Sequence, residues 1–388
     1  MIEQKRGKAR VGISGSYGGL NLGDEAILQA IVTELRKSLP VEITVFSRDA
    51  EDTRRRHAVE NVVPVREWAR TEVLPEIEKL DLYLLGGGGI LYDAEARIYL
   101  REVELARQSG VPIMVYAVGV GPLRDPAIQR LVRDALWSAA AVTVRERKAR
   151  RELEDIGLQR DVVVTADPAF LLEPEPIPED TLKREQMDQG HRLVAMSVRE
   201  PGVAAPGLDD LTYHGLFANA ADFIIDRYDA DVVFVPMERR MMDMQHSHAV
   251  ISQMLFPQRA WVLRGEYTPG QVLALMGCFD FAVGMRLHFL MFAAMREVPF
   301  VALPYADKVS GLLDDFGMEM PPISLVNSGR LIAHIDRSWD ERTWIKQRIQ
   351  ENLPVLKERA GETNRIAVRL LTAANRSIEP ERLGAAGS

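Results

Sequence analysis

The sequence is poor in two features, cysteine and long apolar runs, that mark several classes of protein. Its 388 residues include one cysteine, Cys278, so no disulfide can form within the chain, which suits the reducing cytosol. No apolar run approaches the length of a membrane span, and the charged residues 1–10 lack the apolar core of a signal peptide. We therefore expect a cytoplasmic protein.

The sequence also lacks an excess of basic residues. Its 48 Lys and Arg against 56 Asp and Glu give a formal net charge of −8, and the pI is about 5.6. Because proteins bind the phosphates of nucleic acids through a basic face, we expect no nucleic-acid partner. The same balance still permits local basic pockets for small anions.

Common cofactor and nucleophile motifs are missing as well. The glycines of residues 12–23 do not follow the dinucleotide spacing G-x-G-x-x-G, and no lysine with a following serine or threonine completes a P-loop. No G-x-S-x-G sequence supports a nucleophilic serine. His246 and His248 have the spacing of a metal pair, but no cysteine or paired carboxylate accompanies them. We therefore expect neither a metal nor a cofactor.

What the sequence does contain is a regular alternation of short apolar strands with amphipathic helices. In the first half, strands are expected at 11–15, 41–46, 82–85, 113–118, 141–144 and 162–164. The proline-rich stretch 173–180 cannot hold a regular element and indicates a linker. Beyond it, strands are expected at 193–198, 232–235, 261–263, 278–283 and 298–304. This alternation predicts an α/β fold with two doubly wound, mostly parallel sheets.

The length of the chain also predicts more than one domain, because single cores rarely grow to this size. We predict an N-terminal Rossmann-like domain at 1–178 and a C-terminal Rossmann-like domain at 179–338. A helical segment at 339–388 is expected to pack back on the N-terminal domain. Cys278 falls within an apolar strand of the second domain, so we expect a buried, inert thiol.

Charged residues follow the expected strands at their carboxyl ends. Arg286 and His288 lie between a strand and an apolar helix, and Lys308 follows the next strand. Arg199 and, in the first domain, Arg145 follow strands of their own. Ligands of open α/β sheets bind outside the carboxyl ends of the strands. Fixed cations, an imidazole and a helix N-terminus in one such place favour a compact anion.

Histidine by itself is a weak signal, because most histidines are structural. The case for His288 rests on Arg286, two residues before it, and on Lys308 at the next strand end. The remaining histidines outside the 246–248 pair have polar neighbours in the sequence and are expected at the surface: His57, His191, His214 and His334.

Two glycine-rich segments follow strands of the first domain. The first strand leads into residues 15–25, and the strand at 82–85 leads into Gly86–Gly89. Glycine lets a ligand or another chain segment approach the backbone closely. From the sequence alone, a ligand-binding turn and a purely structural turn explain both segments about equally well.

Several short motifs occur in a fixed order along residues 11–320. They are the segment 18–25 (Gly-Gly-Leu-Asn-Leu-Gly-Asp-Glu), the four glycines at 86–89, Val144-Arg145-Glu146, residues 167–172 (Asp-Pro-Ala-Phe-Leu-Leu), Ser197-Val198-Arg199, Gly284-Met285-Arg286-Leu287-His288 and residues 304–309 (Pro-Tyr-Ala-Asp-Lys-Val). Each motif is weak alone. As an ordered set, they resemble the polysaccharide pyruvyl transferase family, including its cell-wall enzymes of the CsaB type.

The resemblance implies a GT-B-like arrangement, with two Rossmann-like domains facing across a cleft. It implies transfer of pyruvate from phosphoenolpyruvate to a sugar of a cell-surface polysaccharide or its lipid-linked precursor, forming a cyclic ketal and releasing phosphate. Position by position, His288 matches the catalytic histidine of the family. The positions expected to hold the donor are Arg145, Arg286 and Lys308, to which we add Arg199 for its equivalent placement.

For the acceptor, the resemblance points to the glycine-rich segments. Asn21, Asp24 and Glu25 match the loop expected to bind the sugar, and we add Gly87 and Gly88 as expected acceptor-binding residues. Phosphoenolpyruvate would be a substrate, so no cofactor is implied. A lipid-linked acceptor would bring the chain to the inner face of the membrane without an anchor. The sequence departs from the CsaB pattern at 16–20 and 237–248, which leaves the acceptor open, and it does not specify an oligomeric state.

Two other functions fit the same residues. A GT-B glycosyltransferase would use Arg286 and Lys308 to hold the diphosphate of a nucleotide sugar. A non-catalytic relative would bind an anionic sugar without turnover, which the intact Arg-Leu-His sequence and Lys308 disfavour.

Overall fold

The computed structural model describes residues 7–187, 190–201, 208–238, 242–303, 306–319 and 327–377. The chain divides into two compact units. The first contains the residues up to Gly19, Asp24–Leu172 and the chain from Lys357 onward, and the second contains Leu20–Gly23 and Glu173–Leu356.

The boundary at 172/173 lies before the expected one at 178/179 because the proline-rich stretch packs on the second unit. Within that unit, the Glu175 amide donates to the Gly270 carbonyl at 3.0 Å, and the Thr268 hydroxyl donates to the Glu175 carboxylate.

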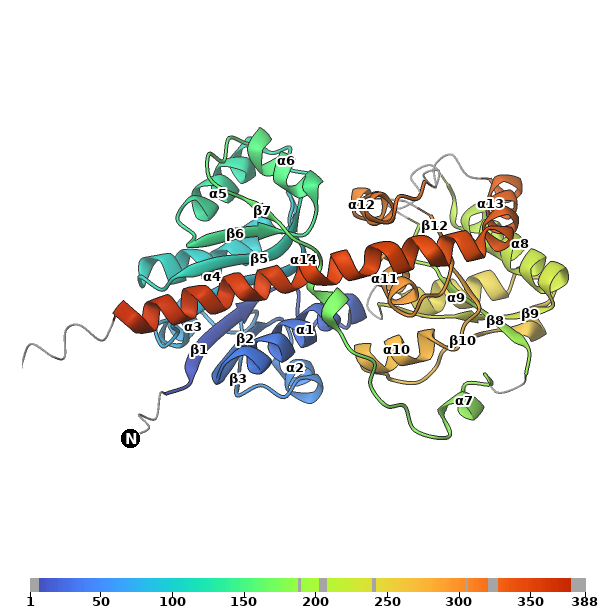
Figure 1. The fold of residues 1–388 in the computed structure, drawn as a ribbon, viewed down its shortest axis with the longest axis horizontal. Helices are drawn as coiled ribbons and strands as arrows, with labels where there is room; N and C mark the ends of the chain where they lie inside the picture. The colour runs from blue at the N-terminus through green and yellow to red at the C-terminus, as the bar shows by residue number, and fades with distance from the viewer. Residues whose placement is uncertain are drawn as a thin grey trace, which may run out of the picture. The chain divides into compact units, whose positions relative to one another are not determined.

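The first unit is built on a seven-stranded parallel sheet with the order β3-β2-β1-β4-β5-β6-β7 (Figure 1). Its strands are β1 Ala9–Ser14, β2 Val41–Ser47, β3 Asn61–Pro64, β4 Leu82–Leu91, β5 Ile113–Val120, β6 Ala141–Val144 and β7 Val163–Val164. Its helices are α1 Leu22–Ser38, α2 Ala50–Arg56, α3 Arg70–Ile77, α4 Ala96–Gln108, α5 Pro126–Trp137 and α6 Arg147–Asp155, with a 3₁₀ turn at Pro168–Leu171. The central strands are buried on both faces, as parallel strands flanked by helices must be.

The strand β4 continues beyond the expected end at Leu85 and carries its four glycines inside the sheet. Gly86 and Gly88 pair with residues of β5, so the glycines form a strand rather than a turn. The reason is the close packing of α1. A Cβ on Gly87 would lie 2.0 Å from Ile27 Cγ2, and Gly87 and Gly88 have φ values of +30° and +83°. The short strand β3 is not among the strands expected from the sequence.

The second unit is built on a five-stranded parallel sheet with the order β10-β9-β8-β11-β12. Its strands are β8 Arg192–Ser197, β9 Ala230–Phe234, β10 Ala260–Val262, β11 Phe281–Gly284 and β12 Phe300–Ala302. Its helices are α7 Thr181–Arg184, α8 Asp210–Tyr228, α9 Asp243–Ile251, α10 Pro269–Met276, α11 Leu287–Met295, α12 Asp307–Phe316 and α13 Ser328–Asp340, with a 3₁₀ turn at Pro257–Arg259.

The expected strand at 278–283 is shorter in the structure. The helix α10 begins with a capping box formed by Thr268 and Gln271 and is followed by Gly277. Cys278 lies in the turn after this helix and is exposed, so the prediction of a buried thiol within a strand is wrong. The apolar run there spans the end of a turn and a short strand, which sequence periodicity does not separate.

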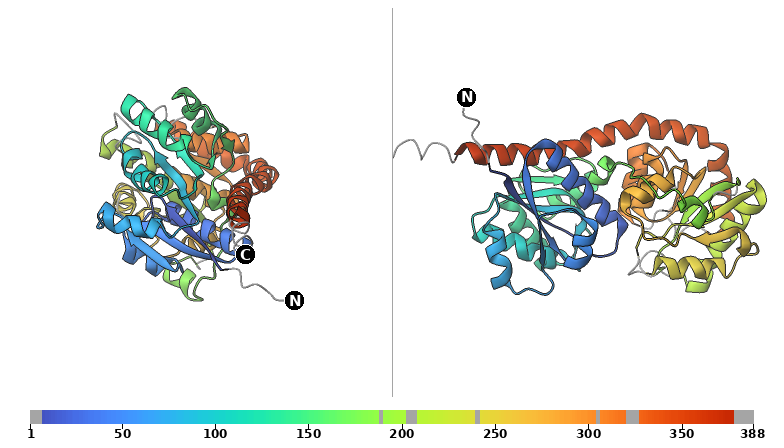
Figure 2. Two further views of the ribbon diagram at one scale, coloured as in Figure 1. Left: turned by 90° about the vertical axis from the view of Figure 1, so that its left-hand side faces the viewer. Right: turned by 90° about the horizontal axis from the view of Figure 1, so that it is seen from below.

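The last described helix, α14 Arg342–Ser377, is unbroken despite Pro354, as Figure 2 shows. Residues up to Leu356 belong to the second unit and those from Lys357 to the first. Within the first unit, Arg359 donates to the Thr165 carbonyl at 2.6 Å, and the Thr363 and Thr165 hydroxyls lie 2.8 Å apart. No helix among the described residues is both long and apolar enough to span a bilayer.

Candidate functional site

In the second unit, the structure brings four of the predicted residues to one edge of the sheet, together with a glutamate that was not predicted. Arg199 follows β8, Arg286 and His288 follow β11, Lys308 follows β12, and Glu238 follows β9. The last residues of β8, β11 and β12 are register partners, so these chain segments leave the sheet side by side. The order of strands reverses between β8 and β11, which is where ligands bind in doubly wound sheets.

Arg286 is the residue that caps the start of α11, and its side chain is held by three carboxylates. Its Nε donates to Asp243 Oδ2 at 3.1 Å, and its Nη2 donates to Asp243 Oδ1. Nη1 lies 3.3 Å from Glu238 Oε2, and Nη2 lies 3.3 Å from Glu200 Oε2. Burial opposes the positive charge, but Asp243, Glu200 and Glu238 outweigh it and raise the pKa of Arg286 above its ordinary value.

Asp243 fixes this arrangement. Its side chain is fully buried and also accepts the backbone amides of Met237 and Glu238 at 3.1 and 3.0 Å. A buried carboxylate of this kind requires a charged partner, which Arg286 supplies. The sequence analysis identified Arg286 but missed Asp243, Glu200 and Glu238. The adjacency of Glu200 to Arg199 was the only local signal, because the other two lie far from Arg286 along the chain.

His288 is the second residue of α11 and lies against the backbone of Gly23. A Cβ on Gly23 would lie 1.9 Å from His288 Nδ1, so only glycine fits beside the imidazole. The segment Leu20–Gly23 is anchored on the second unit by the Leu22 amide, which donates to the Met237 carbonyl at 2.9 Å. Asn21 Nδ2 lies 3.3 Å from Glu238 Oε2 and its Oδ1 accepts the Gly23 amide at 2.9 Å.

The backbone around Lys308 and Arg199 completes this edge of the sheet. Lys308 is the second residue of α12 and is partly buried. Pro304 and Tyr305, which precede it in the motif, lie outside the described residues. The Arg199 side chain pairs with Glu200, and its carbonyl accepts the Tyr213 hydroxyl at 2.8 Å.

Arg145, in the first unit, is a buried ion-pair residue. It follows β6, is 5% exposed, and donates from Nη1 to Asp167 Oδ2 at 2.8 Å. Its guanidinium lies against Gly119, where a Cβ would be 2.9 Å from Nη2. Burial opposes its charge, but Glu146 and Asp167 more than compensate and raise the pKa of Arg145. The structure thus places Arg145 on a different unit from Arg286, His288 and Lys308.

The remaining predicted acceptor residues also belong to the first unit. Asp24 lies over β4, since a Cβ on Gly88 would be 3.2 Å from Asp24 Oδ1. Glu25 is 1% exposed, accepts the Gly18 amide at 2.9 Å and lies 2.7 Å from His57 Nε2. Its geometry fits a role in holding the glycine-rich segment and does not fit the predicted direct contact with an acceptor. Gly87 and Gly88 likewise serve the packing of α1.

Two histidines that were expected at the surface are buried. His57 is 6% exposed and pairs with Glu25, and His214 is 6% exposed with its Nε2 2.9 Å from His246 Nδ1. Burial and the nearby His246 lower the pKa of His214. Polar neighbours in the sequence did not reveal either burial, because the partners come from other elements.

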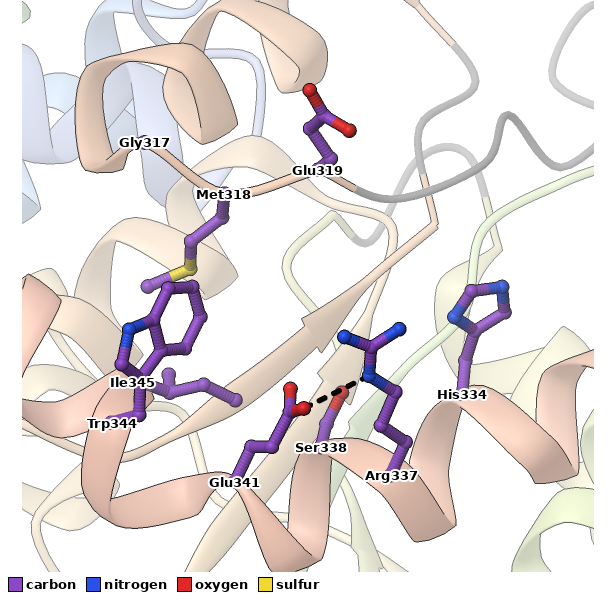
Figure 3. Close-up of a pocket in the computed structure, with 9 residues that line it drawn as sticks. All are labelled: Gly317, Met318, Glu319, His334, Arg337, Ser338, Glu341, Trp344 and Ile345. Atoms are coloured by element: carbon purple, nitrogen blue, oxygen red, sulfur yellow. Dashed lines mark hydrogen bonds and ion pairs between the residues drawn. The ribbon is translucent and has the colours of Figure 1, made fainter.

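A cavity of about 620 Å³ in the second unit lies away from these residues, between the end of α12, α13 and the start of α14. Met318 and Trp344 form an apolar side, and Arg337 and Glu341 form an ion pair of 3.0 Å (Figure 3). Since Glu341 neutralises Arg337 and Glu319 adds a negative charge, this cavity does not suit the predicted anion. None of the predicted site residues lines it.

A model of the polysaccharide pyruvyl transferase family matches residues 21–307. A comparison with curated protein sequences finds no match.

Among solved structures, a UDP-N-acetylglucosamine 2-epimerase from Listeria monocytogenes has a TM-score of 0.66 at 14% identity, covering 96% of this chain and 97% of its own. The Neisseria meningitidis enzyme bound to UDP-GlcNAc has a TM-score of 0.62 at 13% identity, with coverages of 95% and 100%. An Anabaena protein in complex with UDP and glucose has a TM-score of 0.62 at 13% identity, covering 94% of this chain and 100% of its own. At such low identity these likenesses show the fold alone, and they confirm the predicted GT-B-like class with two Rossmann-like domains.

Proposed function

The chain belongs to the polysaccharide pyruvyl transferase family, and we propose that it transfers pyruvate from phosphoenolpyruvate to a sugar. The acceptor would be a sugar of a cell-surface polysaccharide or its lipid-linked precursor, and the product a cyclic ketal with release of phosphate. The observation that carries the proposal is the gathering of Arg199, Arg286, His288 and Lys308 at the carboxyl ends of adjacent strands in the second unit.

The cations of this edge suit the donor. Phosphoenolpyruvate carries a carboxylate and a phosphate, and the guanidinium fork matches such planar and tetrahedral oxyanions through paired hydrogen bonds. Asp243 would keep Arg286 in place while the ligand replaces Glu200 and Glu238, whose contacts with Arg286 are the longer ones at 3.3 Å. Lys308 would act as a point charge on the phosphate.

His288 would move the proton that the reaction needs. The protonated imidazole would give its proton to the C3 methylene, which leaves positive character at C2. The first sugar hydroxyl then adds at C2 and returns a proton to the imidazole. The second hydroxyl then displaces phosphate from C2, and its proton leaves with the phosphate. A positioned general acid and base contributes about 10²–10⁴-fold to such a step. The contact with Gly23 would hold the imidazole in one orientation.

The acceptor would be bound with the help of Asn21 and Asp24. Asn21 belongs to the segment that lies against His288, and its amide also reaches Glu238. Arg145 stays a proposed donor residue. Because its guanidinium already pairs with Asp167, its contribution to donor affinity is to be measured by itself in a binding experiment. A lipid-linked acceptor would bring the protein to the cytoplasmic face of the membrane.

The test is a screen of the purified chain with phosphoenolpyruvate and candidate free and lipid-linked saccharides, followed by mass spectrometry and a phosphate assay. A saccharide whose mass increases by one pyruvate ketal, with stoichiometric phosphate release, supports the proposal. Release of a nucleotide from a nucleotide sugar, without phosphate release from phosphoenolpyruvate, would favour the glycosyltransferase instead. Binding of an anionic sugar without any product would favour a non-catalytic relative.

A further inference from the structure

A second cavity, of about 300 Å³, lies wholly within the first unit and has a basic lining. It opens beyond the carboxyl ends of the neighbouring strands β1, β2 and β3, and the first turns of α4 close its other side. Arg48 follows β2, Arg66 follows β3, and Arg101 comes from α4 together with Tyr99 and Glu102. We call it the basic cavity.

The charges in the basic cavity do not cancel. Its charged lining consists of three arginines and Glu102, a formal excess of two positive charges. Arg101 pairs with Glu102 at 2.6 Å and donates to the Val65 carbonyl at 2.7 Å, which fixes its guanidinium. Arg48 and Arg66 make no ion pair with any residue in the described ranges, so they carry the excess.

The side chain of Arg48 is oriented by hydrogen bonds to Ser16, but not all of its N–H groups have an acceptor among the residues that the structure describes. Its Nη2 donates to the Ser16 carbonyl at 3.2 Å and to the Ser16 hydroxyl. Its Nε is buried and finds no acceptor within the described part of the chain. A buried N–H without an acceptor is costly, and an oxygen of a bound anion would satisfy it. A Cβ on Gly19 would lie 3.2 Å from Arg48 Nη2, so the glycine keeps space open beside the guanidinium.

The arginines of the basic cavity differ from the other strand-end arginines in their hydrogen-bond partners. The guanidiniums of Arg286 and Arg145 already contact carboxylates, whereas Arg48 and Arg66 have donors to spare. Two positive charges match a phosphate monoester dianion or a diphosphate better than a single carboxylate. The volume leaves room for an attached sugar ring, which the side chains of Tyr99 and Ile98 would contact.

We propose that the basic cavity binds a phosphoryl group of the saccharide acceptor, and this inference rests on the proposed function. The phosphoryl group can belong to a soluble sugar phosphate or to a lipid-linked saccharide diphosphate. Arg48 and Arg66 would supply the charge, and Arg101 would supply a positioned donor. The same sugar without its phosphoryl group would then bind weakly.

The experiment is isothermal titration calorimetry on the full chain with a hexose 1-phosphate, the unphosphorylated hexose and inorganic pyrophosphate, each in the presence of saturating phosphoenolpyruvate. We expect the hexose 1-phosphate to bind at least tenfold more tightly than the hexose. The double variant Arg48→Gln/Arg66→Gln should lose at least tenfold in affinity for the hexose 1-phosphate and for pyrophosphate. Arg107→Gln, which removes an exposed arginine of the same helix α4, is the matched control and should lose neither.

Phosphoenolpyruvate is titrated separately into the same proteins. An unchanged affinity in the double variant, with an unchanged melting temperature, supports a site distinct from the donor site. A parallel loss of phosphoenolpyruvate affinity would overturn the inference, because the cavity would then be the donor site. Equal affinity of wild type and double variant for the hexose 1-phosphate and for the lipid-linked form would overturn it as well.

The two sources are separated with a polyprenyl diphosphate saccharide in phosphatidylcholine vesicles, read by vesicle flotation. Loss of flotation or of hexose 1-phosphate binding in the double variant supports the inference and identifies the source. If phosphoenolpyruvate fails to bind and no ketal forms, but Arg48 and Arg66 still govern phosphate binding, the proposed donor chemistry falls and the phosphate site stands.

Discussion

The two units place arginines in equivalent positions beyond parallel strands, yet their environments differ. In the second unit, Arg286 is clamped by Asp243 and touched by two glutamates, beside a histidine held against glycine. In the first unit, Arg145 is neutralised by Asp167, whereas Arg48 and Arg66 line a cavity with surplus charge. The comparison teaches that a carboxylate partner fixes a strand-end arginine in place, whereas an arginine without such a partner keeps its charge and donors available to an anion.

The largest effect is expected from removing the imidazole of the second unit. His288→Ala should lower kcat for phosphate release by about 10²–10⁴-fold, because the general acid and base is lost. Phosphoenolpyruvate affinity should change little. The matched control is His191→Ala, whose side chain is 51% exposed. Near-normal turnover by a folded His288→Ala protein, judged by circular dichroism, would exclude His288 as the proton carrier.

The next effect tests whether the backbone of residue 23 positions this imidazole. Gly23→Ala would place a methyl group 1.9 Å from His288 Nδ1, so the ring must move. We expect a loss in kcat of about 100-fold, similar to the effect of misplacing a reacting group by an ångström. Gly329→Ala on α13 of the same unit is the control, since its Cβ would have no neighbour closer than 3.6 Å. Equal activities of the two variants would contradict the positioning role.

Each unit contains a buried ion pair between an arginine and an aspartate, and breaking this pair should destabilise the unit that contains it. Asp243→Asn and Asp167→Asn each leave a buried guanidinium without its main carboxylate. A loss of about 3–5 kcal/mol in the free energy of unfolding is expected for each, measured by urea denaturation. Asp134→Asn, at a surface pair on α5, should cost no more than about 1 kcal/mol. A similarly small cost at position 243 would mean that Arg286 is not clamped.

A smaller effect, a gain in donor affinity, is expected from neutralising a carboxylate that contacts Arg286. Glu200→Gln removes one of the charges that compete with an anionic donor for Arg286. We expect phosphoenolpyruvate to bind roughly two- to fivefold more tightly, the size of a partly exposed charge interaction. Glu341→Gln, in the cavity of about 620 Å³ in the second unit, should leave the affinity for phosphoenolpyruvate unchanged. Weaker binding by Glu200→Gln, measured calorimetrically, would assign Glu200 a supporting role instead.

The smallest effect concerns pH and the buried His214. Because burial and His246 lower its pKa, the folded state favours the neutral ring. Its contribution to stability is complete above the unfolded pKa of about 6.5 and is lost as the pH falls through the lower folded pKa. The urea midpoint should therefore fall more steeply between pH 7.5 and pH 5 in the wild type than in His214→Gln. Parallel pH profiles would show that His214 titrates normally.

Much of the fold could be predicted from the sequence, because strand and helix periods are local properties. The alternation of apolar runs with amphipathic helices predicted two parallel sheets, and glycines marked some element ends, such as Gly15 after β1 and Gly277 after α10. The exceptions have a common cause. Gly86–Gly89 lie inside β4 because α1 packs against them, and Cys278 is exposed because α10 ends just before it. In both cases a neighbouring element decides the local structure.

The sequence by itself determined that Arg199, Arg286, His288 and Lys308 lie at strand ends, since the carboxyl ends of parallel strands share one edge of a sheet. Only the tertiary structure decided which charges meet there. Asp243 lies 43 residues before Arg286 and Glu200 lies 86 residues before it, so no local pattern pairs them. The same holds for Arg48, Arg66 and Arg101, which separate strands and a helix bring to one cavity. Burial and pairing arise between distant segments, and they decide whether a cation is free to bind a ligand.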